Sequence, residues 1–112
     1  MSPDDLWRVQ HMIEAAEQAL AFVQRRERAD LDSDPMLLLA LTRAVEIVGE
    51  AAAQVSEAGR GELPAVPWPQ IIGMRNRLIH AYFDINRNIL WDTVLLALPT
   101  LLQQLRATPG KE

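Results

Sequence analysis

Apolar residues recur at steps of three and four through most of the chain, and this helical period limits the possible folds more than any other feature. Two of these stretches also carry a start signal. Ser2 stands before Pro3, and Asp34 stands before Pro35, so each pair places a capping side chain ahead of a proline at the first helical position. Asp5 extends the first signal into a pattern like a capping box. Because no segment alternates as a strand does, the sequence predicts an all-α fold.

The predicted architecture is an up-and-down bundle of four main helices, because the helical stretches are joined by short connections. The last helix should follow a cap at Asp84 or Asn86 and should kink at Pro99, whose ring removes one backbone hydrogen bond. The helices are expected at about 3–28, 35–58, 68–82 and 86–106, with turns at 29–34 and 59–67. The residues expected to share an apolar face are Leu6, Val9, Ile13, Ala16, Leu20 and Val23 in the first helix and Leu37, Leu41, Ala44, Val45, Val48, Ala51, Ala52 and Val55 in the second. The apolar residues of the last helix include Ile89, Leu90, Val94, Leu98, Leu101 and Leu105.

Length and composition indicate one globular domain over residues 1–112, with residues 107–112 as a frayed tail. Apolar residues make up 49% of the chain, but no apolar run approaches the roughly 18 residues that a membrane span requires. There is no cysteine, and the start lacks the basic-then-apolar profile of a signal peptide, so a cytoplasmic protein is expected. The net charge of −4 argues against a large surface that clamps nucleic acid by its phosphates.

Positive charge is concentrated in residues 71–90, where Arg75, Arg77 and Arg87 outnumber Asp84. This local excess on an acidic chain favours a small anionic target held at one place. The segment also holds the densest group of chemically active side chains in the sequence. These are Arg75, Asn76, Arg77, His80 and Tyr82.

Arg75 falls in the middle of the apolar stripe predicted for the third helix. Its guanidinium keeps its charge, and burying it unpaired would cost several kcal/mol. A carboxylate, a subunit interface or an anionic ligand should therefore meet it, and Glu46 or Glu50 of the second helix is the nearest candidate in the chain. A purely structural ion pair is the alternative to a functional one. The other residues of the stripe are Trp68, Ile71, Ile72, Leu78, Ile79, Tyr82 and Phe83.

The second helix carries a mixed outer face, where Arg43, Glu46 and Glu50 line up beside Leu39 and Ile47. A solvent face rarely combines two large aliphatic side chains with an acidic pair, so this face is interpreted as a second interface. It could meet another helix, another subunit or a ligand. The alternative is an ordinary exposed face with charge pairs three and four residues apart.

His80 lies about 140° around the predicted helix from Arg75, so the two do not share a face. Asn76, four residues before His80, does share that face and could orient the imidazole. For Arg75 and His80 to act together, the reach of the arginine, a loosened helix end or a second subunit must bring them close. A surface histidine without a role is the alternative.

An arginine and a histidine are sufficient for phosphodiester cleavage without a metal ion. The imidazole moves protons near neutral pH, and the guanidinium stabilises charge that develops on the phosphoryl oxygens. In RNA the 2′-hydroxyl supplies the nucleophile, so the protein need not provide one. The sequence contains no metal-ligand spacing, phosphate-binding glycine loop or nucleophile elbow of the familiar kinds.

The motif Arg75-x4-His80-x-Tyr82 resembles that of HEPN-domain ribonuclease toxins of the HepT type, the DUF86 family. The resemblance covers residues 3–106 in order and without large gaps. Outside the motif it is carried by residues 43–51, 66–68, 72–76, 85–86 and 90–91.

This resemblance implies a HEPN-like helical bundle that forms a homodimer, with the motifs of both subunits lining one cleft. It implies a metal-independent endoribonuclease without cofactor, acting as the toxin of a type II/VII-like toxin–antitoxin pair. Arg75 and His80 would be catalytic. The cognate antitoxin would be a minimal nucleotidyltransferase that uses ATP to adenylylate Tyr82. The supporting residues would be Arg43, Glu46, Glu50, Asn76 and Arg77.

Two other functions remain open on the sequence. One is a non-catalytic module that docks the nucleotidyltransferase or binds a nucleotide, with Arg75 as an anion clamp. The other is a purely structural dimeric scaffold, in which Arg75 would serve only the fold.

Overall fold

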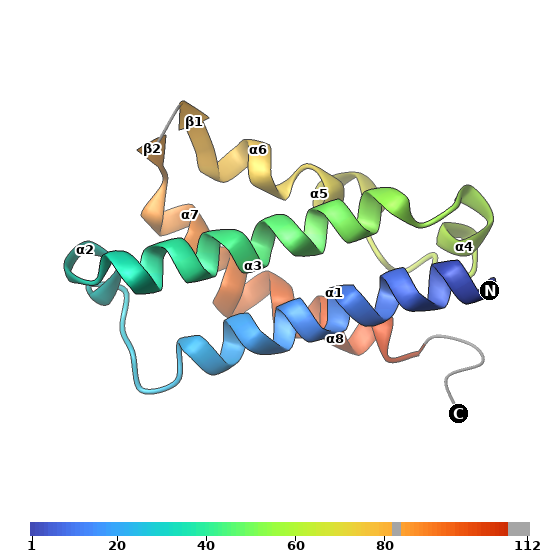
Figure 1. The fold of residues 1–112 in the computed structure, drawn as a ribbon, viewed down its shortest axis with the longest axis horizontal. Coiled ribbons are helices and arrows are strands. Elements are labelled where there is room, and N and C mark those ends of the chain that lie inside the picture. Colours follow the sequence, from blue (N-terminus) through green and yellow to red (C-terminus); the bar gives the residue numbers. More distant parts are fainter. Residues whose placement is uncertain (82–83, 108–112) are drawn as a thin grey trace.

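Two long helices, α1 (Pro3–Phe22) and α3 (Pro35–Gln54), lie side by side and form the centre of the molecule (Figure 1). The structure is a computed structural model that describes residues 1–81 and 84–107, and for His80 and Ala81 it describes the backbone only. The other elements are α2 (Asp30–Ser33), α4 (Glu57–Gly61), α5 (Trp68–Ile72), α6 (Met74–Leu78), β1 (Ile79–Ala81), β2 (Asp84–Ile85), α7 (Arg87–Asp92), the π-helical turn η1 (Thr93–Ala97) and α8 (Leu98–Leu105).

The remaining helices cover this pair from two sides. The segment from α5 to β2 runs along α3, whereas the last helical segment passes behind α3 and packs on α1 through α8 (Figure 1). The all-α class is confirmed. The described residues add one feature that the sequence did not predict, which is a small antiparallel ribbon of β1 and β2. Among these residues, no helix is both long and apolar enough to cross a membrane.

The apolar period of the sequence identifies the core correctly. All the residues of α3 that were expected to face inward are buried. In the first helix Leu6 and Leu20 are only partly buried, and in the last one Ile89 stays 36% exposed. The face of α1 toward the core combines Val9, Met12 and Ile13 with the small residues Ala15, Ala16 and Ala19, and these alanines let α1 and α3 approach closely.

The first helix ends earlier than expected, at Phe22 rather than near residue 28. Arg25 adopts a φ of 62°, in the left-handed region, and the N–H of Arg26 donates to the carbonyl of Val23, so the chain turns away. The guanidinium of Arg26 then bonds the carboxylate of Asp34 at 2.8 Å. This bond, followed by bonds from backbone N–H groups of α3, lowers the pKa of Asp34, which caps α3 as predicted.

The stretch expected as a turn at 29–34 contains α2, and the next stretch, expected at 59–67, begins with α4. The second helix correspondingly ends at Gln54, before residue 58. Ser56 starts α4 by accepting a hydrogen bond from the N–H of Gly59. Each of these short helices is set by a local cap or turn. Such a signal spans only a few residues, so it does not appear in the longer apolar period of the sequence.

Asp5 links the start of α1 to the start of α4. Ser2 caps α1 as predicted, but Asp5 does not complete a capping box. Its carboxylate instead accepts hydrogen bonds from the backbone N–H and the hydroxyl of Ser56, 51 residues away. These two bonds, the backbone one first, lower the pKa of Asp5, whose side chain is buried. A side chain at Gly59 would collide with this carboxylate, since a Cβ there would lie 2.5 Å from Oδ2.

The third predicted helix is broken in the middle and ends early. Gly73 separates α5 from α6, and α6 ends at Leu78 instead of continuing to residue 82. Beyond Leu78 the chain is extended, and β1 pairs with β2 through Ile79 opposite Ile85. The sequence does not reveal this change, because apolar residues continue at helical steps from α6 into residues 79–81, which form β1.

The last helical segment begins at a cap on Asn86, one of the two predicted positions, and it contains a π-helical turn. The N–H of Leu98 donates to the carbonyl of Thr93, five residues back. Pro99 follows at once and has no N–H to donate to Leu95. The disturbance expected from Pro99 therefore takes the form of η1.

Replacing Asp5 by asparagine should lower the free energy of unfolding by about 1–3 kcal/mol at pH 7, because an amide cannot accept both bonds from Ser56. Since the folded-state pKa is the lower one, the carboxylate stabilises the protein fully above its unfolded pKa of about 3.9. This contribution is lost as the pH falls through the folded pKa. Urea unfolding at several pH values measures it.

The matched control is Asp4→Asn, because Asp4 lies in the same helical turn but is exposed. The difference between wild type and Asp5→Asn should shrink at acidic pH, whereas Asp4→Asn should change stability little at any pH. An Asp5→Asn protein as stable as the control at pH 7 would contradict the link through Ser56.

Candidate functional site

The Arg-x4-His motif crosses a junction between a helix and a strand. Arg75 is in α6, whereas the backbone of His80 belongs to β1. The N–H of Asn86 donates to the carbonyl of Leu78 at 2.6 Å, which holds the chain after β2 against the end of α6. The positions of Arg75 and His80 are therefore set by this junction and not by the pitch of one helix.

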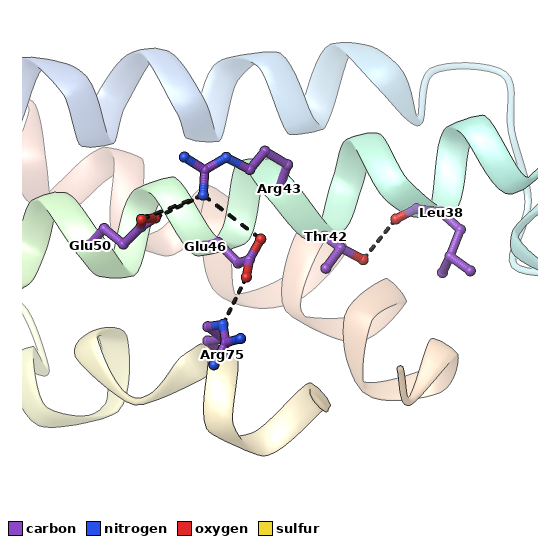
Figure 2. A network of polar contacts seen from close by, with 6 residues as sticks. All are labelled: Leu38, Thr42, Arg43, Glu46, Glu50 and Arg75. Carbon is purple, nitrogen blue, oxygen red and sulfur yellow. Dashed lines mark hydrogen bonds and ion pairs between the residues drawn. The ribbon is translucent and has the colours of Figure 1, made fainter. Parts of the chain in front are cut away.

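Arg75 is held by a carboxylate of α3. Its Nε lies 2.7 Å from Oε2 of Glu46, as Figure 2 shows. The other oxygen of Glu46 lies 3.8 Å from a terminal nitrogen of Arg43, and that nitrogen bonds Glu50 at 2.9 Å. The mixed outer face of the second helix thus forms a network of two arginines and two glutamates (Figure 2). The expectation that Glu46 could meet Arg75 is confirmed, while Glu50 pairs with Arg43.

Glu46 and Arg75 meet because α5 packs very close to α3. At Gly49, one turn beyond Glu46, a Cβ would lie 3.3 Å from the carbonyl oxygen of Ile71 and 3.4 Å from that of Ile72. Such contacts are tighter than a side chain ordinarily accepts, so glycine permits this distance between the helices. Gly49, a glycine within α3, therefore sets the position of α5 and, through α5, that of α6.

Arg75 is not buried in the apolar stripe, and this expectation was wrong. Its side chain is 54% exposed, while Glu46 is 20% exposed. The helical wheel assumed one continuous helix from Trp68, but the turn at Gly73 changes the phase of the helix. Met74 therefore faces the core in place of Arg75, together with Leu78, which was expected there. Because Glu46 engages Nε, both terminal nitrogens of Arg75 remain without a partner among the described residues.

Asn76 and Arg77, which follow Arg75 in α6, are also exposed. Arg77 donates to the carbonyl oxygen of Gln70 at 3.3 Å, and within the described part of the chain no carboxylate lies within ion-pair distance of it. Asn76 was expected to share a helix face with His80, but the helix ends between them at Leu78. The spacing argument for Asn76 therefore does not apply, and its role stays a prediction.

Two motif residues are beyond what the structure describes. Tyr82 lies outside the described residues, and so does the side chain of His80. The sequence placed Tyr82 on the apolar stripe of a continuous helix, but α6 ends at Leu78, before this residue. Whether Arg75 and His80 meet stays a prediction.

The electrostatic character of the described site comes from paired charges and from exposed guanidiniums. Arg43, Arg75, Glu46 and Glu50 balance one another, whereas Arg77 adds a net positive charge. Arg87 lies 3.7 Å from Asp32 of α2. In the described ranges, no three His, Cys, Asp or Glu side chains are placed to hold a metal ion. The arrangement can bind a phosphate at Arg75 without first breaking its bond to Glu46.

Comparison with known proteins supports a single family. Residues 12–108 match a family described as "Ribonuclease HepT-like". A "Putative RNase" of Caldanaerobacter subterraneus subsp. tengcongensis is 36% identical over 104 residues, which are 93% of this chain and 93% of that protein. A second "Putative RNase", of Methanocaldococcus jannaschii, is 32% identical over 83% of this chain and 85% of its own.

A "Probable ribonuclease HepT" of Thermococcus cleftensis is 38% identical over 72 residues, which are 64% of this chain and 66% of that protein. No solved structure is significantly similar to the chain.

Replacing Glu46 by glutamine should change the free energy of unfolding by less than about 1 kcal/mol, because the Arg75 side chain is more than half exposed and solvent screens the pair. Thermal or urea unfolding at low and high salt measures the effect. A loss of more than about 3 kcal/mol would instead mark a desolvated ion pair that the fold requires. The Asp5→Asn protein provides the reference for a buried carboxylate.

Proposed function

The chain belongs to the HepT-like ribonuclease family, and on that premise we propose that it is a metal-independent endoribonuclease that acts in the cytoplasm as the toxin of a type II/VII-like toxin–antitoxin pair. The observation that carries this proposal is the state of Arg75. Its guanidinium is held from one side by Glu46 and offers its terminal nitrogens to solvent. A guanidinium fixed in this way is prepared for a phosphate.

In the proposed reaction the 2′-hydroxyl of the RNA attacks the adjacent phosphorus, and the bond to the 5′-oxygen of the next nucleotide breaks. A cyclic 2′,3′-phosphate and a free 5′-hydroxyl result. Arg75 stabilises the negative charge that develops on the phosphoryl oxygens. His80 takes the proton of the 2′-hydroxyl or gives one to the leaving oxygen. In a homodimer the second copy supplies another His80, so each proton transfer has its own imidazole.

Glu46 has a positioning role in this scheme. By accepting from Nε it fixes the plane of the guanidinium, so that less rotational freedom is lost when Arg75 binds the phosphate. Arg43 and Glu50 hold Glu46 and its surroundings in turn. Arg77 and Asn76 are exposed on the same short helix and are proposed to contact RNA near the bond that is cut.

Control of the enzyme is proposed to act on Tyr82, through a nucleotidyltransferase antitoxin that uses ATP. Adenylylation places a phosphodiester and an adenosine two residues from His80. The added negative charge would compete with the RNA phosphate for Arg75, which suffices to stop cleavage. A non-catalytic module that docks the transferase is the competing function, and the cleavage experiment below separates the two.

Purified wild-type protein should cleave single-stranded RNA in the presence of EDTA, and His80→Ala should lower the rate by about 100-fold or more. Arg75→Lys should lower it by a similar factor, because lysine cannot bond Glu46 and a phosphate with the same fork geometry. Product chromatography that detects the cyclic phosphate measures the reaction.

The matched control for the arginine is Arg106→Gln, which removes an exposed, paired arginine at the end of α8. Its cleavage rate should equal that of the wild type. Cleavage by His80→Ala at the wild-type rate would refute the catalytic assignment. Absence of cleavage by the wild type, together with binding of a nucleotidyltransferase, would favour the non-catalytic module.

Tyr82→Phe should cleave RNA at nearly the wild-type rate but should escape silencing by the antitoxin, because phenylalanine has no hydroxyl to adenylylate. Mass spectrometry of both proteins after incubation with the transferase and ATP should find added AMP on the wild type only. Covalent addition of AMP to the Tyr82→Phe protein would place the modification on another residue.

A further inference from the structure

A cavity of about 420 Å³ opens between α1 and α3, on the side of α3 from which Arg43 reaches toward α1 (Figure 2). Arg8 and His11 of α1 line it, together with Arg43, Ile47 and Glu50 of α3. Its volume lies within the range of small-molecule sites. A cavity that mixes apolar side chains with charged ones, two guanidiniums and an imidazole among them, suits a planar ring that carries an anionic group.

The α1 side of the cavity carries a cluster of ring systems. The indole of Trp7 lies 4.0 Å from the imidazole of His11 between ring centroids, with the planes tilted by 49°. The guanidinium carbon of Arg8 stands 4.6 Å from the indole centroid. Trp7 is 53% exposed. Exposed ring systems beside arginines are the groups on which single-stranded nucleic acids stack.

The charges divide the cavity into two ends. Arg43 is paired with Glu50, whereas none of the carboxylates that the structure describes lies within ion-pair distance of Arg8. A smaller hollow of about 210 Å³ adjoins the cavity, shares His11 and Ile47 with it, and is lined by Glu14. A phosphate in the cavity is therefore attracted to Arg8 and kept out of the adjoining hollow by Glu14, and the uncharged base fits beside His11 and Ile47.

The cavity is also connected to the catalytic arginine. Arg43 lines the cavity, and its terminal nitrogen lies 3.8 Å from the Glu46 carboxylate that holds Arg75 at 2.7 Å. Two guanidiniums thus flank Glu46, one on the cavity side of α3 and one on the α6 side (Figure 2). A single-stranded RNA that crosses α3 at Glu46 would reach both the cavity and Arg75.

From these observations we infer that the cavity binds one nucleotide of the single-stranded RNA substrate, with its phosphate at Arg8 and its base beside His11 and Ile47. The bound nucleotide lies a short distance along the strand from the phosphate at Arg75. This inference rests on the proposed ribonuclease function. It adds a substrate contact on α1, a helix that contributes nothing to the Arg-x4-His motif.

Binding is measured with the full-length His80→Ala protein, which leaves the RNA uncut, and a fluorescent ten-nucleotide single-stranded RNA at several salt concentrations. Adding Arg8→Gln should weaken binding by about 10-fold, since one charged hydrogen bond to phosphate is lost. It should also make the slope of log affinity against log salt less negative by about 0.7. Arg106→Gln, at a residue that does not line the cavity, should change neither quantity.

A second variant fills the cavity without removing a charge. Ala53 lines the cavity and is exposed, so Ala53→Trp should block it while leaving the core intact, and RNA should bind about 10-fold more weakly. The inference is overturned if Arg8→Gln and Ala53→Trp both bind the RNA as tightly as the parent and with its salt slope. Thermal unfolding of each variant confirms that it folds.

Free AMP tests the alternative that the cavity binds a free nucleotide, which presents the same kinds of group, a base and a phosphate, as the RNA. AMP should bind much more weakly than the RNA; if it binds as tightly and displaces the RNA, the cavity is a site for a free nucleotide and the inference is wrong. Cleavage assays separate this outcome from failure of the proposed function. A wild-type protein that cuts no RNA refutes that function, whereas a cutting wild type with unaltered binding by Arg8→Gln refutes only the cavity.

Discussion

The close packing of α5 on α3 at Gly49 is the contact on which the arrangement of the site depends. The backbone carbonyls of Ile71 and Ile72 occupy the space where any other residue would place its side chain. Because α5 lies this close to α3, the following helix α6 stands where Arg75 reaches Glu46. A methyl group at this point would press on backbone atoms rather than on a flexible side chain, so α5 would have to shift by a few tenths of an ångström to admit it.

The ion pairs that Glu46 makes with Arg43 and Arg75 orient the two guanidiniums more than they stabilise the fold. Glu46 is shared by Arg43 and Arg75, so a change in either guanidinium alters the field at the other. Exposed pairs of this kind contribute little to the free energy of unfolding, while a bond to Nε restricts how the guanidinium can turn. Stability comes instead from the apolar faces of α1 and α3 and from the buried Asp5–Ser56 link.

The sequence predicted what depends on local periodicity and caps, which includes the faces of the long helices and the caps at Ser2, Asp34 and Asn86. It missed features that depend on one backbone angle or on distant contacts. Arg25 turns left-handed without a glycine, and Asp5 pairs with a serine 51 residues away. The sequence placed Arg75 on a buried face because the prediction assumed one continuous helix, and the spacing of apolar residues does not reveal the break at Gly73. The cavity at His11 needs two helices placed together, which no single segment encodes.

The π-helical turn before Pro99 has a consequence for how the last helix meets the core. Leu90, Val94 and Leu98 are fully buried at intervals of four, although a regular helix would rotate each successive member by about 40°. The wider turn absorbs the surplus rotation and keeps the three side chains in one line. Leu95 and Leu96, within the same turn, stay 40% and 69% exposed. With a regular α-helix in place of η1, Leu90, Val94 and Leu98 would instead be spread over about 80° of the helix surface.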